Sequence, residues 1–334
     1  MEPQLPKYFI TGGRQRPSSL LSRAEWFAYE KAVLIELDTD TGRSRPVLAY
    51  ESPAGRRPAA KPSFVFKAGA WDGDHLLLCT QTEALWVDPE SFEVTGTVSH
   101  PWLNDVHHVD VFDGGIHFAN TGLDCLIVLE PDGALRRCDP AQDEDLWARF
   151  DKDIDYRTVP TTKPHKSHPN YVFRTKHGVW LNRSLDKDAV CMDDRSRVID
   201  LTAPGVPHDG IVRPDGVWFT TTEGHLLQCD PDAAKVVRNI ELGTLDPDAA
   251  PTRWCRGLHF QDDLAYVGFS RLRPTKARAN LSWVKRSLGF KDTATHNSRV
   301  TAYDLKAGKL VGSWDMEEHG LNAVFSILPR RPLS

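Results

Sequence analysis

The sequence predicts an all-β protein, a six-bladed β-propeller, and three observations lead to this prediction. An apolar strand, an acidic turn and a second strand recur six times along the chain. Asp, Pro and Gly in these turns suit short antiparallel hairpins. A second strand pair precedes most copies, and no helical periodicity of useful length interrupts them. Four-stranded units at this spacing are typical of propeller blades. The turn acids are Asp38, Asp88, Glu130, Asp193, Asp230 and Asp304.

Five units contain both strand pairs, and the sixth is divided between the two ends of the chain. The outer two strands of this sixth blade fall in residues 33–50, and Tyr8–Thr11 supplies the strand inside them. The inner strand is missing there, but Asn322–Leu328 at the other end has the right pattern. We therefore expect the C-terminal strand to pair with the N-terminal strands, because closure removes unpaired sheet edges. The whole of 1–334 then forms a single propeller domain.

Composition excludes several classes of function. The 334 residues are 40% hydrophobic and 26% charged, which is ordinary for a globular protein. A net charge of −5 argues against nucleic acid as a partner. No apolar run approaches the roughly 20 residues of a membrane helix, so no membrane partner is expected. The first residues lack a basic segment followed by an apolar one, and the six cysteines are scattered. These features favour the cytoplasm, with the cysteines buried and reduced.

Three connections are unusually long, at 12–32, 139–166 and 271–297. By strand direction all three lie on the same face, the top, and we interpret them as a lid. The alternative is that they are unrelated insertions. Residues 271–297 contain seven basic residues and one acidic residue, and part of the segment has a short amphipathic pattern. Such a loop attracts an anionic substrate or an acidic partner, or it is simply a solvated basic loop.

Histidines mark the predicted top ends of the inner strands. His107 and His208 each precede a turn glycine, Gly115 or Gly216, by eight positions. His168 and His319 lie near the start of two further inner strands. Four imidazoles around one axis predict a divalent transition metal, zinc, iron or copper, since imidazole is a common ligand for each. The alternatives are a hydrogen-bonded polar channel with water and a metal-free acid–base site. The second-choice ligands are His108, His165 and His259.

The two blades without such a histidine offer cations instead. Lys67 and Arg256 occupy nearby positions in the first and fifth blades, and either cation suits a carboxylate or phosphate. Arg256 would hold the acidic group of a substrate, or it would brace the pore by pairing with Asp105 or Asp209. These two aspartates are also placed to orient a ligating imidazole through its second nitrogen.

Several motifs resemble a family of uncharacterised bacterial propellers that is known only as a domain of unknown function. Trp254–Phe260 with Leu264–Pro274, Val206–Phe219 and Leu103–Val106 carry the resemblance, which covers roughly 100–275. It draws attention to Asn104, as a substrate contact, and to Asp105, His208 and Arg256.

More distantly, the sequence resembles two kinds of six-bladed enzyme. Lactonases of the gluconolactonase type bind a divalent metal through Glu, Asn and Asp. The peptidylamidoglycolate lyase that completes peptide amidation holds zinc on three pore histidines, which is closer to the ligand type here. This chain shows no secretory signal and no evident disulfides, unlike that lyase. Carotenoid-cleaving propellers use four histidines on iron, but they have seven blades.

The resulting expectation is a metal-dependent lyase or hydrolase that acts on a small, anionic metabolite or a peptide. An iron oxygenase is a variant of this hypothesis. The metal polarises a substrate oxygen or activates water, and Arg256, Asp105 and Asp209 act as catalytic residues. Lys67 and Asn104 contact the substrate. The alternative is a non-catalytic propeller that binds a protein or a small ligand, since fold alone does not fix function.

Overall fold

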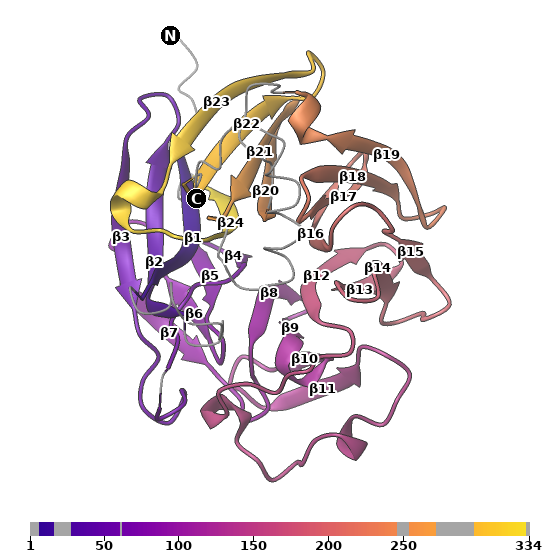
Figure 1. Ribbon diagram of the computed structural model, residues 1–334. Coiled ribbons are helices and arrows are strands. Elements are labelled where there is room, and N and C mark those ends of the chain that lie inside the picture. The colour runs from indigo at the N-terminus through magenta and orange to yellow at the C-terminus, as the bar shows by residue number, and fades with distance from the viewer. Residues whose placement is uncertain (1–6, 17–27, 61, 246–253, 272–296, 332–334) are drawn as a thin grey trace, which may run out of the picture.

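The computed structural model describes residues 7–16, 28–60, 62–245, 254–271 and 297–331. Six antiparallel sheets of four strands surround a central axis (Figure 1). The predicted all-β fold and its six-bladed propeller architecture are thus confirmed. No helix in the described part of the chain is long and apolar enough to cross a membrane.

Each blade runs from an inner strand at the axis to an outer strand at the rim. The first blade is β4 (Ala70–Asp72), β5 (His75–Cys79), β6 (Ala84–Val87) and β7 (Val94–Val98); the second is β8 (Val106–Phe112), β9 (Gly115–Asn120), β10 (Cys125–Leu129) and β11 (Leu135–Pro140). The third is β12 (Pro169–Thr175), β13 (Gly178–Arg183), β14 (Asp188–Cys191) and β15 (Val198–Asp200); the fourth is β16 (Pro207–Arg213), β17 (Gly216–Thr221), β18 (His225–Asp230) and β19 (Lys235–Glu241). The fifth is β20 (Cys255–Gln261), β21 (Leu264–Phe269), β22 (Arg299–Asp304) and β23 (Lys309–Asp315); the sixth is β24 (Val324–Pro329), β1 (Lys7–Gln15), β2 (Tyr29–Asp38) and β3 (Ser44–Tyr50).

The two ends of the chain close the ring in the sixth blade, as predicted. β24 pairs antiparallel with β1, and Ile327 lies opposite Ile10. Both side chains enter one apolar cluster together with Ile35 of β2 and Val300 of β22. Closure therefore buries a strand edge and joins the sixth blade to the fifth through a shared core.

The acidic residues of the outer hairpins fold the turns between their strands. The Asp38 carboxylate accepts hydrogen bonds from the backbone N–H groups of Asp40 and Thr41, both at 3.1 Å. The same pattern of N–H donors two and three residues further on recurs at Asp88, Asp230 and Asp304. An aspartate that satisfies two turn amides fixes a tight turn, which explains why the motif repeats.

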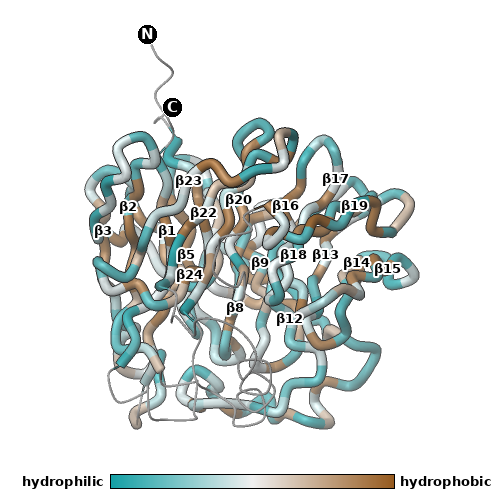
Figure 2. The backbone as a smooth tube through the Cα atoms, turned by 45° about the horizontal axis from the view of Figure 1, so that its top comes forward, coloured by the Kyte–Doolittle hydropathy of each residue, from teal (hydrophilic) through white to brown (hydrophobic). Residues whose placement is uncertain are grey.

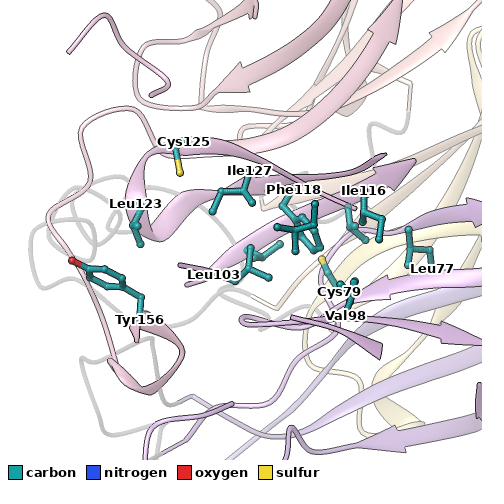
Figure 3. Packing of buried hydrophobic residues seen from close by; sticks show 14 of the residues in the cluster. Leu77, Cys79, Val98, Leu103, Ile116, Phe118, Leu123, Cys125, Ile127 and Tyr156 are labelled. Atoms are coloured by element: carbon teal, nitrogen blue, oxygen red, sulfur yellow. The ribbon is translucent and has the colours of Figure 1, made fainter. Parts of the chain in front are cut away.

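Hydrophobic residues recur along the strands of the blades (Figure 2), and their buried side chains form clusters that neighbouring blades share. Figure 3 shows the packing between the first and second blades, where Leu77 and Cys79 meet Ile116, Phe118 and their neighbours. All six cysteines are free, and five of them are buried. Sheets that pack face to face in this way hold the inner strands rigidly around the axis.

The long connections differ in how much of them the structure describes. The first predicted insertion, 12–32, begins and ends within strands, because β1 continues over residues 12–15 and β2 already includes residues 29–32. The predicted 139–166 insertion carries two short 3₁₀ helices, η4 (Leu146–Ala148) and η5 (Tyr156–Thr158), and it lies beside the pore. Most of 271–297, with its basic residues and its amphipathic pattern, lies outside the described residues.

Candidate functional site

Irregularities at the starts of the inner strands place a set of side chains on the axis. In five inner strands the pairing register shifts near the strand's first residues, as at a β-bulge, and a bulge re-aims the side chains that it leaves unpaired. The unpaired residues are His107 in β8, Asn170 in β12, Asp209 and Gly210 in β16, Arg256 and Gly257 in β20, and Phe325 in β24.

Six residues at or beside these places form what we call the pore ring, namely Lys67, His107, Asn170, His208, Arg256 and Phe325. His208 directly precedes the shift in β16, and Lys67 precedes β4. A constant spacing relates five of the six, because each stands eight positions before the first residue of the second strand of its blade. These five are Lys67 before β5, His107 before β9, Asn170 before β13, His208 before β17 and Arg256 before β21. Each blade therefore contributes one side chain to the ring.

A cavity of about 460 Å³ lies on one side of the pore ring. Lys67, His107, His208, Arg256 and Phe325 form its floor. The segment after β11, residues 141–168, forms one wall. It supplies Arg157, Val159, Pro160, Thr161, Lys163, His165 and His168. We call this space the upper cavity, and its volume is in the range of small-molecule sites.

Basic groups outnumber acidic groups around the upper cavity. The charged residues of its lining are the basic Lys67, Arg157, Lys163, Arg256 and Arg271 and the acidic Asp105. Arg157 pairs with Asp155 at 2.7 Å and Arg271 with Glu317 at 3.1 Å, and neither of these carboxylates lines the cavity. The lining thus carries an excess of basic side chains, which the carboxylates of Asp155 and Glu317 offset in part, and this excess favours a ligand of negative charge.

An ion pair and a histidine meet at the floor of the upper cavity. Lys67 Nζ lies 2.9 Å from Asp105 Oδ1, and His107 Nε2 lies 3.5 Å from the same oxygen. Burial acts to raise the pKa of Asp105, but the Lys67 ammonium and His107 hold this pKa well below its usual value. Burial, reinforced by Lys67, lowers the pKa of His107 to about 3. At neutral pH an ionised carboxylate therefore faces an uncharged imidazole.

Two more histidines join this group from the segment after β11. The rings of His107 and His168 meet edge to face with centroids 4.8 Å apart. His168 Nδ1 lies 3.1 Å from His165 Nδ1. Burial lowers the pKa of both His165 and His168. The sequence analysis gave His165 only as a second-choice ligand, and the structure places it beside His168.

His208 approaches the floor from the fourth blade. It is 9% exposed, and its Nδ1 lies 3.2 Å from the backbone oxygen of Val206. Burial, with Arg256 nearby, lowers its pKa to about 3. The predicted residues His107, His168 and His208 are thus brought together, and all three are uncharged at neutral pH.

Asp209 and Arg256 lie where the fourth and fifth blades meet. The hydroxyl of Thr220 donates to Asp209 at 2.5 Å, and the backbone N–H of Gly257 donates to both carboxylate oxygens at 3.1 Å. Burial raises the pKa of Asp209 to about 6. The Arg256 guanidinium lies over the Phe325 ring, 3.6 Å from its centroid, a favourable cation–π contact. Asp209 thus fixes the bulge that carries Arg256.

His319 does not belong to the site, and its prediction as a metal ligand is wrong. It ends the 3₁₀ helix η7 (Glu317–His319), which the chain forms before it enters the sixth blade. Its Nε2 lies 2.8 Å from the Ser44 hydroxyl on β3, at the rim of that blade. The position of the pore ring in the sixth blade belongs to Phe325, six residues later.

Asn104, which the sequence analysis predicted as a substrate contact, holds the segment after β11 in place. Its Nδ2 donates to the backbone oxygens of Tyr156 and Val159, at 2.8 and 2.9 Å. Asn104 also borders the upper cavity. It therefore anchors the segment 141–168 over the pore, and both of its amide protons are already used.

A much smaller space, the lower cavity of about 10 Å³, lies on the other side of the pore ring. Its lining comprises Ala68, His107, Asn170, Tyr171, His208, Asp209, Arg256 and Phe325. Asn170 donates both amide protons, to Ser184 Oγ and to the Pro207 backbone oxygen, and its buried Oδ1 has no partner. Sequence reasoning missed Asn170, although the eight-position spacing identifies it.

The residues fit the predicted transition metal only in part. Imidazole nitrogens are suitable donors, and four histidines, His107, His165, His168 and His208, line the upper cavity. However, no three His, Cys, Asp or Glu side chains in the described residues are arranged to hold an ion. Lys67 and Arg256 also bring positive charge to the same floor, which opposes a divalent cation. Metal binding therefore stays a prediction, and we derive no step through it.

Comparison with known proteins supports the fold. No family model matches the sequence, and no curated protein matches it. A protein of unknown function from Bacteroides caccae is 12% identical, with a TM-score of 0.62 over 98% of this chain and 100% of its own. A chain of a nidogen/laminin complex is 12% identical, with a TM-score of 0.57 over 96% and 97% of the two chains. A "putative 6-phosphogluconolactonase" from Bacteroides fragilis is 13% identical, with a TM-score of 0.49 over 95% and 84%. At such identities the likeness concerns the fold alone.

Proposed function

We propose that the protein is an enzyme, a lyase or a hydrolase, that acts on a small organic anion in the upper cavity. The observation that carries this proposal is the joint presence of a cationic lining and of uncharged, buried histidines beside an ionised aspartate. The first feature suits binding of an acid. The second suits transfer of a proton.

Binding of the anion is assigned to the floor of the cavity. Lys67 and Arg256 border this floor from the first and fifth blades. Arg256 presents a planar guanidinium, which matches a carboxylate or phosphate bidentately. Asp209 acts as a positioning residue, because it holds the Gly257 amide next to Arg256.

Proton transfer is assigned to His107. Burial and Lys67 hold its pKa at about 3, so the imidazole is uncharged at neutral pH and its free nitrogen is available, but it takes up a proton only where nearby negative charge offsets these two effects. The imidazolium that forms is then stabilised by the Asp105 carboxylate, whose nearest oxygen is 3.5 Å from Nε2. Lys67 keeps this carboxylate ionised through its 2.9 Å contact. His168 and His165 extend the cluster towards the cavity wall.

A matched pair of probes tests the binding step. We expect phenylacetate, but not the neutral phenylacetamide, to raise the melting temperature and to bind in calorimetry. Arg256→Gln should weaken phenylacetate binding at least about tenfold, as loss of a charge-assisted contact does. Arg238→Gln, at an exposed position of β19, is the control and should bind like the wild type. Equal binding of acid and amide would contradict the proposal.

A turnover screen tests the chemical step. Mixtures of carboxylate esters, lactones and hydroxy acids are incubated with the protein and followed by proton NMR. His107→Gln should lower kcat by about 10²-fold or more while anion binding is kept. If carboxylates bind and nothing is turned over, the non-catalytic binding propeller is the better description.

Metal analysis addresses the remaining expectation separately. The predicted cofactor requires close to one equivalent of zinc, iron or copper in protein that has never met a chelator. His107→Ala and His208→Ala should then remove it, whereas His75→Ala on β5 should not. Well under one equivalent in the wild type would end the metal hypothesis, and the proposal for anion binding would be unaffected.

A further inference from the structure

Besides its charged floor and polar residues such as Thr161 and Ser184, the upper cavity is lined by exposed and half-buried apolar side chains, which we call the rim. Trp254 is 39% exposed and Leu185 is 54% exposed, and both line the cavity. Val159 and Val206 line it as well and are half-buried. These side chains come from four different parts of the chain and line the same cavity. Clustered exposed apolar groups around a cavity mark a binding surface.

Trp254 is held at the rim in an unfavourable backbone conformation. Its φ is +55°, in the left-handed region that bulky residues rarely adopt. Hydrogen bonds fix the backbone on both sides, because its N–H donates to Thr222 O at 2.7 Å and its C=O accepts from Ser270 N at 3.2 Å. Strained residues of this kind cluster at ligand sites. A glycine would fit this backbone without strain, so the indole stands here at an energetic cost.

We infer that the ligand of the upper cavity is an amphiphilic anion, whose acid group lies on the floor at Lys67 and Arg256 and whose hydrocarbon part lies against Trp254 and Leu185 at the rim. This inference rests on the proposed function, and it adds the class of substrate. An acid group gains from the cationic floor. A hydrocarbon chain or ring gains from the apolar rim, where it removes exposed side chains from water.

A polyhydroxylated acid suits this cavity less well. Each hydroxyl that leaves water needs a hydrogen-bond partner, or the desolvation is not compensated. The cavity lining does include hydroxyls, those of Thr161, Ser184 and Thr222 among them, but Val159, Leu185 and Val206 have no polar side-chain atom with which a substrate hydroxyl could pair. The geometry therefore favours fatty or arylalkyl acids over sugar acids.

The test compares octanoate with gluconate by calorimetry on the full chain. We expect octanoate to bind at least about tenfold more tightly, since its chain covers apolar surface that gluconate leaves wet. Trp254→Gly relieves the backbone and removes the indole. It should weaken octanoate about tenfold and leave gluconate unchanged, and Trp254→Phe should recover most of the loss. Leu185→Ser should act in the same direction. Val237→Ser, at a 51% exposed position of β19, is the matched control.

The outcomes separate this inference from the function beneath it. Gluconate binding as tightly as octanoate, or octanoate binding Trp254→Gly like the wild type, overturns the amphiphilic ligand but leaves anion binding intact. Failure of octanoate, gluconate and phenylacetate alike overturns both. A melting temperature for Trp254→Gly at or above that of the wild type shows that the variant is folded. If Trp254→Gly does not fold, the binding of octanoate to Leu185→Ser, which changes no strained backbone, decides whether the rim contacts the hydrocarbon part.

Discussion

The ammonium of Lys67 lies 2.9 Å from the carboxylate of Asp105, and this ion pair joins the first blade to the second inside the pore. The Lys67 side chain is 7% exposed, so little water competes for the contact. Removing one partner of such a pair leaves the other charge buried and uncompensated.

Lys67→Met should accordingly lower the free energy of unfolding by about 3 kcal/mol, the lower end for a buried pair because Asp105 is partly exposed. The pKa of Asp105 should rise at the same time, because burial then acts on it with less opposition. Chemical denaturation measures the first effect. The double variant Lys67→Met/Asp105→Asn should regain part of the loss, and an unchanged stability of the single variant would show that the ion pair has no energetic role.

Closure of the ring should be visible in a single side chain of β24. Ile327 is 2% exposed and packs between the strands of the sixth blade and its neighbour. Ile327→Ala should reduce the free energy of unfolding by about 2–5 kcal/mol, as other large-to-small changes in cores do. Val311→Ala on β23, at an exposed position, should change it by less than about 0.5 kcal/mol. Similar values for the two variants would mean that β24 is not a core strand.

His108 should make stability depend on pH. It is fully buried, it stacks on Tyr171 with centroids 3.6 Å apart, and burial lowers its pKa to about 3. In the unfolded chain His108 takes up a proton near pH 6.5, whereas in the folded chain it stays uncharged down to about pH 3. The wild type therefore loses stability as the pH falls from about 6.5 towards 3.

His108→Gln lacks this proton uptake. Its stability deficit relative to the wild type should therefore shrink as the pH is lowered from 6 to 4, by up to about 1.4 kcal/mol per pH unit. Tyr171→Phe keeps both the ring and His108, so its difference from the wild type should be the same at each pH. A deficit of His108→Gln that stays constant would show that His108 is charged in the folded protein.

The lower cavity should hold one ordered water molecule. Its volume of about 10 Å³ corresponds to roughly one water-sized sphere. Its lining offers acceptors, Asn170 Oδ1 and Asp209, together with the Arg256 donor. A cation needs acceptors only and an anion donors only, whereas water uses both. A high-resolution crystal structure should show a peak within hydrogen-bonding distance of Asn170 Oδ1, and Asn170→Leu should abolish it. An empty cavity in the wild type would refute this prediction.

The sheets could be predicted from the sequence because their signals are local. An aspartate that folds its own turn, as Asp38 does, repeats wherever a hairpin of the same shape is needed. Closure of the ring could be predicted because the N-terminal strands lacked an inner strand, and the C-terminal segment contained one strand that belonged to no other blade. The register of His107 and His208 was equally local, because it counts positions within a single hairpin.

The site residues could be predicted only where the eight-position spacing within a hairpin was applied. His168 was chosen for its residue type although it stands two positions too early, and the ring position in the third blade is Asn170. His319 failed because the sixth blade has no continuous hairpin in which to count. Ring residues also contact residues of other blades, as the 2.9 Å contact between Lys67 and Asp105 illustrates. No pattern within one blade predicts such contacts.

Because four of the six ring residues, namely His107, Asn170, Arg256 and Phe325, sit at shifts in pairing, the chemistry of this pore is largely independent of the sheets that carry it. The side chain of Asn170 or Phe325 takes no part in a strand ladder, so another residue type can stand there without a change in register. Each blade thus presents one side chain to the pore, and this side chain can be substituted while the blade keeps its fold. A propeller of this kind can acquire a new specificity by single substitutions at six known positions, blade by blade, while its architecture stays the same.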